Sequence, residues 1–384
     1  MNVPEEYKDI RPYEPEEIPQ VIDELAQDEQ FKQAMAKALP QMPFDMLIAK
    51  AKQCKTLQDI HVTFDYAFVQ NVIDKLCDGV DMDASSLDKT RNYTFISNHR
   101  DIILDSAFLC KLLLDNGFKK TAEIAIGNNL LVFPWIKKLV RLNKAFIVKR
   151  ELALRDRLLG SKQLSGYMHF AISEKKENVW IAQREGRAKD SNDHTQESII
   201  KMLTMGAEGT LVERLKSLHI VPLTISYEFD PCDFLKAKEF QLKRDNADYK
   251  KTREDDLINM NTGIYGFKGK VHYQTAACLD DWLDSLPTDI ARTDFFTAVA
   301  EHMDHAIHSN YRLYPNNYIA YDKINETNRF ESLYSAAEKE RFENYIHKQI
   351  ERIDLPNADF SFLEHKLLEM YVNPLLNYLK AAEN

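Results

Sequence analysis

The chain has 384 residues, of which 44% are hydrophobic and 29% are charged, and its formal net charge is −10. This composition is typical of a soluble globular protein and excludes fibrous and intrinsically disordered classes. Because the chain is acidic and has no extended basic stripe, nucleic acid is not an expected partner.

The N-terminal residues and the cysteines indicate a cytoplasmic protein. Residues 1–6 contain neither a basic region nor an apolar core, so no signal peptide is predicted. The apolar runs are all shorter than the ~18 residues that a bilayer span needs, so any membrane association is expected to be peripheral. The five cysteines are scattered and odd in number, which indicates reduced thiols.

Three regions are predicted: an N-terminal helical region over residues 1–88, an α/β region over 89–290 and a C-terminal helical region over 291–384. The first ends in a polar connector at 78–86. In the second, apolar strands alternate with helical patterns and with a charged segment, 240–256, that we expect to be mobile. The strands are expected at 93–97, 123–126, 145–148, 179–182, 220–227 and 268–273. This alternation predicts an α/β fold with a mixed, largely parallel sheet flanked by helices.

Charge is unevenly distributed along the chain. Residues 1–30 carry ten acidic and two basic residues, whereas residues 117–150 carry eight basic residues and one acidic residue. A basic segment in an acidic protein indicates a phosphate group or an anionic membrane surface as partner, although most charged runs form a solvated face. Within it, Leu130, Phe133 and Trp135 fit either an interfacial membrane patch or a helix that faces the core.

A histidine lies at a predicted strand-to-helix junction, in the run Asn98-His99-Arg100-Asp101. Asp101 and Asp105 follow His99 by two and six residues, and a carboxylate that reaches back can orient an imidazole as a general base. On this stretch alone, however, a helix cap by Asn98 or Asp101 is the more common arrangement.

Two further segments place charged residues at the ends of predicted strands. Lys149 and Arg150 end one strand, where a guanidinium can bind phosphate through a bidentate contact. Glu185-Gly186-Arg187 follows another strand, where the glycine allows a tight turn and Arg187 is a second phosphate candidate. Taken alone, the first is more typical of a solvated strand end, and the second is equally compatible with a charged turn.

The order of these segments resembles the four motif blocks of the glycerolipid acyltransferase family, the glycerophosphate and lysophosphatidate acyltransferases. Asn98-His99-Arg100 resembles the first block, residues 127–150 the second, Glu185-Gly186-Arg187 the third, and Ile220-Val221-Pro222 to Tyr227 the fourth. The four blocks together, in order across residues 93–228, are a much stronger signal than any one of them.

One spacing departs from the family pattern. The family has four residues between the histidine and the aspartate, whereas five residues separate His99 from Asp105 here. Either Asp105 still faces the ring or Asp101 has taken its role. We favour Asp105, because a carboxylate one helical turn or more away can face the ring without straining the junction.

The resemblance implies an O-acyltransferase of phospholipid biosynthesis. His99 would take the proton from an acceptor hydroxyl as it attacks a fatty acyl thioester, with acyl-CoA or acyl carrier protein as the donor. Backbone N–H groups near the helix start would stabilise the oxyanion. Arg150, Arg187 and Lys149 would anchor the phosphate or carboxylate of a glycerolipid precursor or lysolipid. Glu185, beside Gly186, would hold an acceptor hydroxyl or pair with an arginine.

Two alternatives stay open at this point. A non-catalytic lipid- or acyl-carrier-binding protein on the same fold would account for the altered spacing, and an amino-acid lysolipid would be an acceptor without glycerol. The resemblance requires no cofactor beyond the thioester co-substrate, and contact with the inner membrane face is left open. No metal site is expected, because His302, His305 and His308 fan around a predicted helix and no cysteine cluster lies near them.

Overall fold

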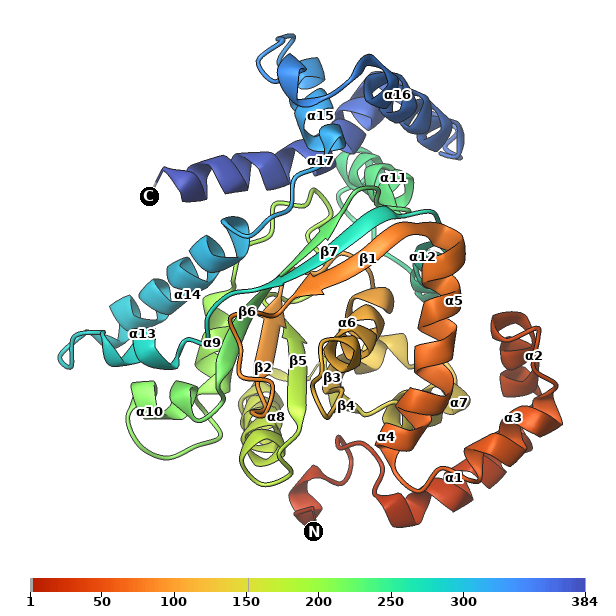
Figure 1. Cartoon of the computed structure of the whole chain (residues 1–384), viewed down its shortest axis with the longest axis vertical. Coiled ribbons are helices and arrows are strands. Elements are labelled where there is room, and N and C mark those ends of the chain that lie inside the picture. The colour runs from red at the N-terminus through yellow and green to blue at the C-terminus, as the bar shows by residue number, and fades with distance from the viewer. Residues whose placement is uncertain (1–2, 151, 384) are drawn as a thin grey trace.

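A seven-stranded sheet organises the computed structural model, which describes residues 3–150 and 152–383. The strands are β1 (Cys77–Asp83), β2 (Thr94–Ser97), β3 (Ala122–Gly127), β4 (Ala145–Val148), β5 (Asn178–Ala182), β6 (Ile220–Tyr227) and β7 (Gly269–Thr275). Their order is β1-β7-β6-β2-β5-β3-β4, and each neighbouring pair is parallel except β6 and β7. The predicted α/β fold with a mixed, largely parallel sheet is therefore confirmed, and Figure 1 shows the helical N- and C-terminal regions on either side of it.

Helices cover both faces of the sheet. They are α5 (Tyr66–Leu76), α6 (Leu104–Asp115), α8 (Leu154–Ser173), α9 (Glu197–Leu203), α10 (Leu211–Lys216), α13 (Asp280–Asp284) and α14 (Arg292–His308). In β2, Phe95 packs into one apolar cluster with α5 and α6, whereas its neighbour Ile96 packs into another with α8, α9 and α14. This alternation is the two-residue period of a strand, and burial on both faces explains why the central strands are apolar throughout.

Two further apolar clusters lie beside the sheet. In the first, α1 (Ile18–Ala26), α2 (Glu29–Ala38) and α3 (Phe44–Ala51) pack on α7 (Pro134–Leu142). In the second, α11 (Asp233–Asp245) packs with α15 (Pro315–Ile324), α16 (Ala336–Glu351) and α17 (Phe360–Ala382). The remaining elements are α4 (Leu57–Ile60), a π-helical turn at His61–Asp65, α12 (Arg253–Tyr265), and short 3-10 turns at Glu5–Tyr7, Pro15–Glu17, Asn128–Leu130 and Glu331–Leu333. Both terminal regions thus share a core with an element of the middle region.

Residues 78–86 do not form the polar connector that we expected. Most of this segment lies in β1, which pairs in parallel with β7 at the edge of the sheet. An edge strand is held by its main-chain hydrogen bonds and can leave its side chains in solvent. Apolar periodicity therefore did not indicate this strand.

The segment 240–256, which we expected to be mobile, is mostly helical. It contains the end of α11 and the beginning of α12, which starts at Arg253. Thr252 Oγ1 accepts a hydrogen bond from Asp255 N, and the Asp255 carboxylate accepts one from Thr252 N. This capping box stabilises the start of α12 despite its high charge.

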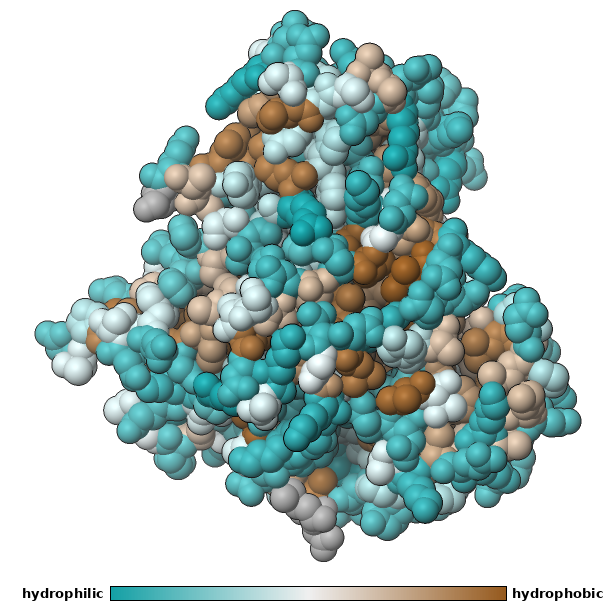
Figure 2. Space-filling model, in the orientation of Figure 1, coloured by the Kyte–Doolittle hydropathy of each residue, from teal (hydrophilic) through white to brown (hydrophobic). Residues whose placement is uncertain are grey.

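Figure 2 shows one face of the molecule, which is mostly hydrophilic and has hydrophobic residues gathered in separate patches. Within the described residues, no helix combines the length and the apolarity that a bilayer span requires.

Candidate active site

Side-chain hydrogen bonds hold the turn between β2 and α6 against the sheet. Asn98 Nδ2 donates to Ile225 O at 2.9 Å, and Asn98 Oδ1 accepts from Ile225 N at 2.8 Å. Trp180 Nε1 donates to Ser97 Oγ at 3.0 Å. These contacts join the end of β2 to both of its neighbours, β6 and β5. His99, the next residue, is therefore presented from a rigid position.

His99 and Asp105 form a hydrogen-bonded pair. Nδ1 of His99 lies 2.8 Å from Oδ2 of Asp105, which is fully buried in the first turn of α6. The same oxygen accepts hydrogen bonds from Arg100 N at 2.6 Å and Asp101 N at 3.0 Å. These contacts hold the carboxylate, which in turn holds the imidazole. With Nδ1 donating to the carboxylate, Nε2 keeps its lone pair, as a general base requires.

Asp101 has a structural contact instead. Its Oδ1 accepts hydrogen bonds from Ile103 N at 2.9 Å and Leu104 N at 2.8 Å, and so it caps α6. Burial, together with the charge of Asp105, raises the pKa of Asp101. Five residues separate His99 from Asp105, one more than in the family pattern. Because α6 begins at Leu104, this additional residue is accommodated in the turn before the helix.

The backbone amides of this turn are already engaged. Residues 100 and 101 donate to Asp105, and residues 103 and 104 donate to Asp101. We expected amides near the helix start to stabilise an oxyanion, but these four are not free to do so.

Arg150 and Glu185 come together beyond the ends of β4 and β5. Arg150 Nε lies 3.9 Å from Glu185 Oε1. The guanidinium crosses Gly127, where a Cβ atom would lie 2.8 Å from Arg150 Nε. Gly186 has a φ of +71°, which the predicted tight turn requires. Arg150, Glu185, Gly186 and His99 all line one cavity.

Lys149 and Arg187 have partners within the protein. Lys149 also lines the cavity, but its Nζ lies 2.5 Å from Asp9 Oδ2. Arg187 lies outside the cavity wall, and its Nη2 donates to Asn259 Oδ1 of α12 at 3.1 Å. Of the five predicted substrate-binding residues, Arg187 is thus the one that the structure places away from His99's cavity.

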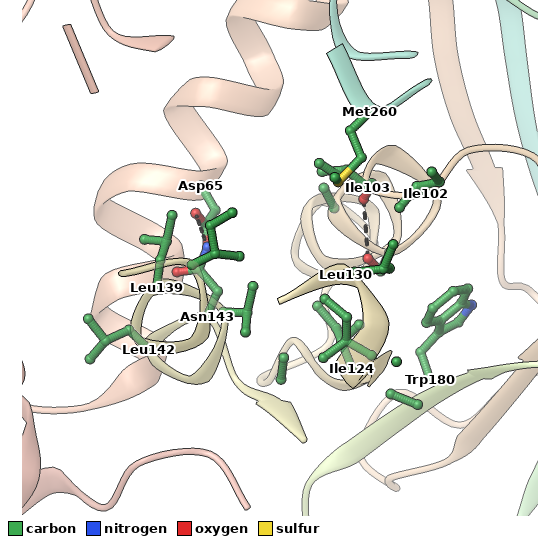
Figure 3. Close-up of a pocket in the computed structure, with 18 of the residues that line it drawn as sticks. Asp65, Ile102, Ile103, Ile124, Leu130, Leu139, Leu142, Asn143, Trp180 and Met260 are labelled. Carbon is green, nitrogen blue, oxygen red and sulfur yellow. Dashed lines mark hydrogen bonds between the residues drawn. The ribbon is translucent and has the colours of Figure 1, made fainter. Parts of the chain in front are cut away.

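The cavity that borders His99 is large and apolar. Its volume of about 1480 Å³ exceeds the ~300–1,000 Å³ of most small-molecule sites. Residues from α1 to α9 and from α12 contribute to the wall. Figure 3 shows Trp180 on one side, Leu139 and Leu142 on the other, and Ile124 and Leu130 between them. Such a wall suits an extended hydrocarbon chain.

Our sequence reasoning missed several residues of this wall. Arg184 lines the cavity beside Glu185, although we singled out only the three residues after it. Leu257, Met260 and Ile264 of α12 also line it. Their spacing of three and four residues is the apolar period of a helix, so this signal was present within the charged sequence.

Several cations of the basic segment 117–150 pair with acidic residues of the same chain. The ion pairs are Lys138–Glu24, Lys149–Asp9, Lys120–Glu177 and Lys144–Glu177. Leu130 and Trp135 face the cavity, and the Trp135 ring lies 5.9 Å from that of Phe31 in α2. For these two residues, the structure favours the core-facing alternative over a membrane patch.

The three histidines at 302–308 face different neighbours. The ring of His302 stacks on Trp282 with centroids 3.9 Å apart, whereas His308 lies beside His194 and Asp304. Nε2 of His308 lies 2.7 Å from the carbonyl oxygen of Asp193, so Nδ1 is the ring nitrogen that this contact leaves available.

Comparison with known proteins gives only a distant likeness. No family model matches the chain, and no curated protein sequence matches it. A solved structure that it resembles is the 1-acyl-sn-glycerophosphate acyltransferase PlsC from Thermotoga maritima, at 12% identity and a TM-score of 0.36. The match covers 75% of this chain and 95% of that one. A likeness at this TM-score supports no conclusion about activity, which must be argued from the chain's own residues.

Proposed function

We propose that the protein is an acyltransferase that moves a fatty acyl group from a thioester donor to a hydroxyl group of a lipid precursor or lysolipid. The observation that carries this proposal is the His99–Asp105 pair at the border of a large apolar cavity. The pair supplies a base for the hydroxyl, and the cavity supplies room for the acyl chain. The ordered motif blocks of the sequence support the same reaction.

The proposed reaction needs only proton transfer and positioning. The acceptor hydroxyl attacks the thioester carbonyl carbon while Nε2 of His99 takes its proton. The C–O bond forms, the tetrahedral intermediate collapses, and the C–S bond breaks. His99 then returns the proton to the departing thiolate. Asp105 keeps the ring oriented and stabilises the imidazolium between the two transfers.

The cations at the cavity border suit an anionic acceptor. Arg150 and Arg184 line the cavity on the same side as Glu185, so a phosphate or carboxylate can bind there while a hydroxyl approaches His99. Lys149 adds positive charge, although it is shared with Asp9. Arg187 would act indirectly, by holding α12 over the site through Asn259. The same cations would serve a glycerophosphate or an amino-acid lysolipid.

The beginning of α8 is our candidate for contact with the inner face of a membrane. Leu158 and Leu159 are 64% and 67% exposed, and the next residue, Gly160, lines the cavity. Arg155 lies beside them, with its side chain 89% exposed. Exposed leucines beside an arginine match a bilayer containing anionic lipid. Vesicle co-sedimentation should weaken for a double Leu158→Ser, Leu159→Ser variant, and unchanged binding would rule out this surface.

Acyl transfer can be tested with one labelled donor and a panel of acceptors. Purified protein is incubated with acyl-CoA or acyl carrier protein thioester, with and without glycerol phosphate, lysophosphatidate and an amino-acid lysolipid. We expect acceptor-dependent thiol release that falls ~10²–10⁴-fold in His99→Ala. The matched control is His347→Ala, because His347 is exposed on α16. Unchanged turnover in a folded His99→Ala variant would contradict the proposal, and chain binding without turnover would favour a non-catalytic lipid-binding protein.

A further inference from the structure

A polar group interrupts the apolar wall of the cavity. Asp65, His61 and Asn143 line it among leucines and phenylalanines. Asn143 Nδ2 donates to Asp65 Oδ1 at 3.1 Å, and His61 Nε2 lies 3.4 Å from Asp65 Oδ2. Figure 3 shows the Asp65–Asn143 pair beside Leu139, across the cavity from Trp180. A purely hydrocarbon chain could form no hydrogen bond with these three side chains.

A local departure from α-helical geometry brings His61 and Asp65 together. Residues His61–Asp65 form a π-helical turn between α4 and α5, in which Tyr66 N donates to His61 O. Such single wide turns cost hydrogen-bond quality and occur frequently at functional sites.

The hydrogen bonds of His61 determine which of its nitrogens carries the proton. Thr121 N and Thr121 Oγ1 both lie within hydrogen-bond distance of Gln58 Oε1, at 3.2 and 3.0 Å. The Thr121 hydroxyl therefore donates to Gln58 and accepts from His61 Nδ1 at 2.9 Å. Nε2 is left as an acceptor. It is buried and has no hydrogen-bond partner among the described residues.

The protonation states complete the group. Burial, together with the charge of Lys144, lowers the pKa of His61 to about 3, so its ring is neutral. Burial raises the pKa of Asp65 to about 7, so near neutral pH its carboxyl is present in both forms. The Asp65 side chain is 27% exposed, and this surface faces the cavity. The wall thus offers both a hydrogen-bond donor and an acceptor.

We infer that the cavity takes an acyl chain that carries a hydroxyl group remote from its thioester, and that Asp65, His61 and Asn143 bind this hydroxyl. The inference rests on the proposed acyl transfer. His99 marks the thioester end of the cavity, because it is the proposed base. Its ring lies 5.6 Å from that of Trp180, which locates this end in Figure 3. Asp65 lies on the other side of the cavity, with Ile124 and Leu130 between. The bound hydroxyl therefore belongs to the middle or far part of the chain.

A hydroxyl fits this group better than a charged substituent does. A carboxylate on the chain would meet the carboxyl of Asp65, and an ammonium would lose its hydration in an apolar enclosure that already holds the buried Lys144 nearby. A hydroxyl both donates and accepts, so it can satisfy Asp65 and His61 Nε2 together. A saturated chain would leave these polar groups of the wall without a hydrogen-bond partner, which costs free energy. This cost sets how strongly a hydroxylated chain is preferred over a saturated one.

The test compares acyl-CoA donors of equal chain length, one saturated and the others with a hydroxyl at successive positions. For the wild-type protein, we expect one group of neighbouring positions to exceed the saturated donor about tenfold or more in kcat/KM. In Asp65→Leu and in Asn143→Leu this preference should disappear while the saturated donor is still used. Asp65→Asn, which keeps the shape of the side chain, should retain part of the preference. Leu333→Met, at an exposed position of the 3-10 turn Glu331–Leu333 and outside the cavity wall, is the control and should keep all of it.

Two outcomes would overturn the inference: no preferred position in the wild-type protein, or a preference that survives in Asp65→Leu. A protein that uses none of the donors would contradict the proposed acyl transfer instead. In that case thermal shifts with free hydroxy and saturated fatty acids still test the site. A larger shift for a hydroxy acid, lost in Asp65→Leu, would support it, and equal shifts would overturn it.

Discussion

The turn that holds His99 and the far wall of the cavity each contain an aspartate beside a histidine, but they are built differently. Asp105 Oδ2 lies within hydrogen-bond distance of three nitrogens, all from residues 99–101. Asp65 has a single donor, Asn143, from a helix 78 residues further along the chain. Through Oδ2, the first carboxylate is held by its own turn, whereas the second is held by a residue from a distant part of the chain. Residues of one turn therefore determine the His99–Asp105 pair, whereas the packing of distant segments determines the Asp65–Asn143 pair.

The largest effect should come from the carboxylate that holds His99. Asp105→Asn keeps the shape of the side chain but lets its amide face the ring, which favours the wrong tautomer, so kcat should fall ~10³–10⁴-fold. Asp101→Asn is the matched control, because an asparagine oxygen can still cap α6, and its kcat should stay within ~10-fold of wild type. Steady-state kinetics with a saturating acceptor measure both. An equally inactive Asp101→Asn would assign the orienting role to Asp101.

The next effect separates Arg150 from Arg187, the two arginines that the sequence predicted to bind the acceptor's anionic group. Arg150→Gln should raise the KM for an anionic acceptor ~10–100-fold, the loss expected for a charge-assisted hydrogen bond, and leave the donor KM unchanged. Arg187→Gln should change the acceptor KM much less, because Arg187 lies outside the cavity wall. Initial rates at varied acceptor and donor concentrations give both constants. The reverse order of effects would place the acceptor beneath α12.

A smaller effect should follow from the volume of the cavity. Leu139→Trp fills space on the wall formed by α7 and should shift the preferred acyl chain to shorter donors, by about tenfold in the kcat/KM ratio of long to short chains. Leu376→Trp, at an exposed position of α17, is the control and should leave the ratio unchanged. A ratio that does not respond to Leu139→Trp would mean that the acyl chain lies elsewhere.

The smallest effect concerns stability and pH. The pKa of Asp65 is about 7 in the folded protein and ~4 in an unfolded chain, so the folded state binds the proton more tightly. The contribution of Asp65 to stability is therefore largest at low pH and declines as the pH rises from about 4 to about 7. Asp65→Asn cannot ionise, so its melting temperature should fall less than that of the wild type between about pH 5 and pH 8. Parallel slopes would contradict the raised pKa.

Local patterns predicted most of the sheet and the strand-to-helix turn that holds His99. β2, β5 and β6 are short apolar runs because helices cover both of their faces, and such runs are visible in a sequence. The sequence pattern did not predict β1, because an edge strand is held mainly by main-chain hydrogen bonds and so lacks an apolar periodicity. The apolar spacing of α12 was obscured by its charged flanks. The division into three regions remains a prediction.

By itself, the sequence determined the α/β fold, the position of His99 at a strand-to-helix junction and the tight turn at Gly186, because each depends on neighbouring residues. Tertiary structure decided which carboxylate meets the ring, since the path of the turn before α6 sets that distance. It also decided that Asp65 and Asn143 meet, because their elements pack side by side although they are far apart in the chain. Periodicity and capping act over a few residues, whereas a cavity wall depends on the packing of whole helices.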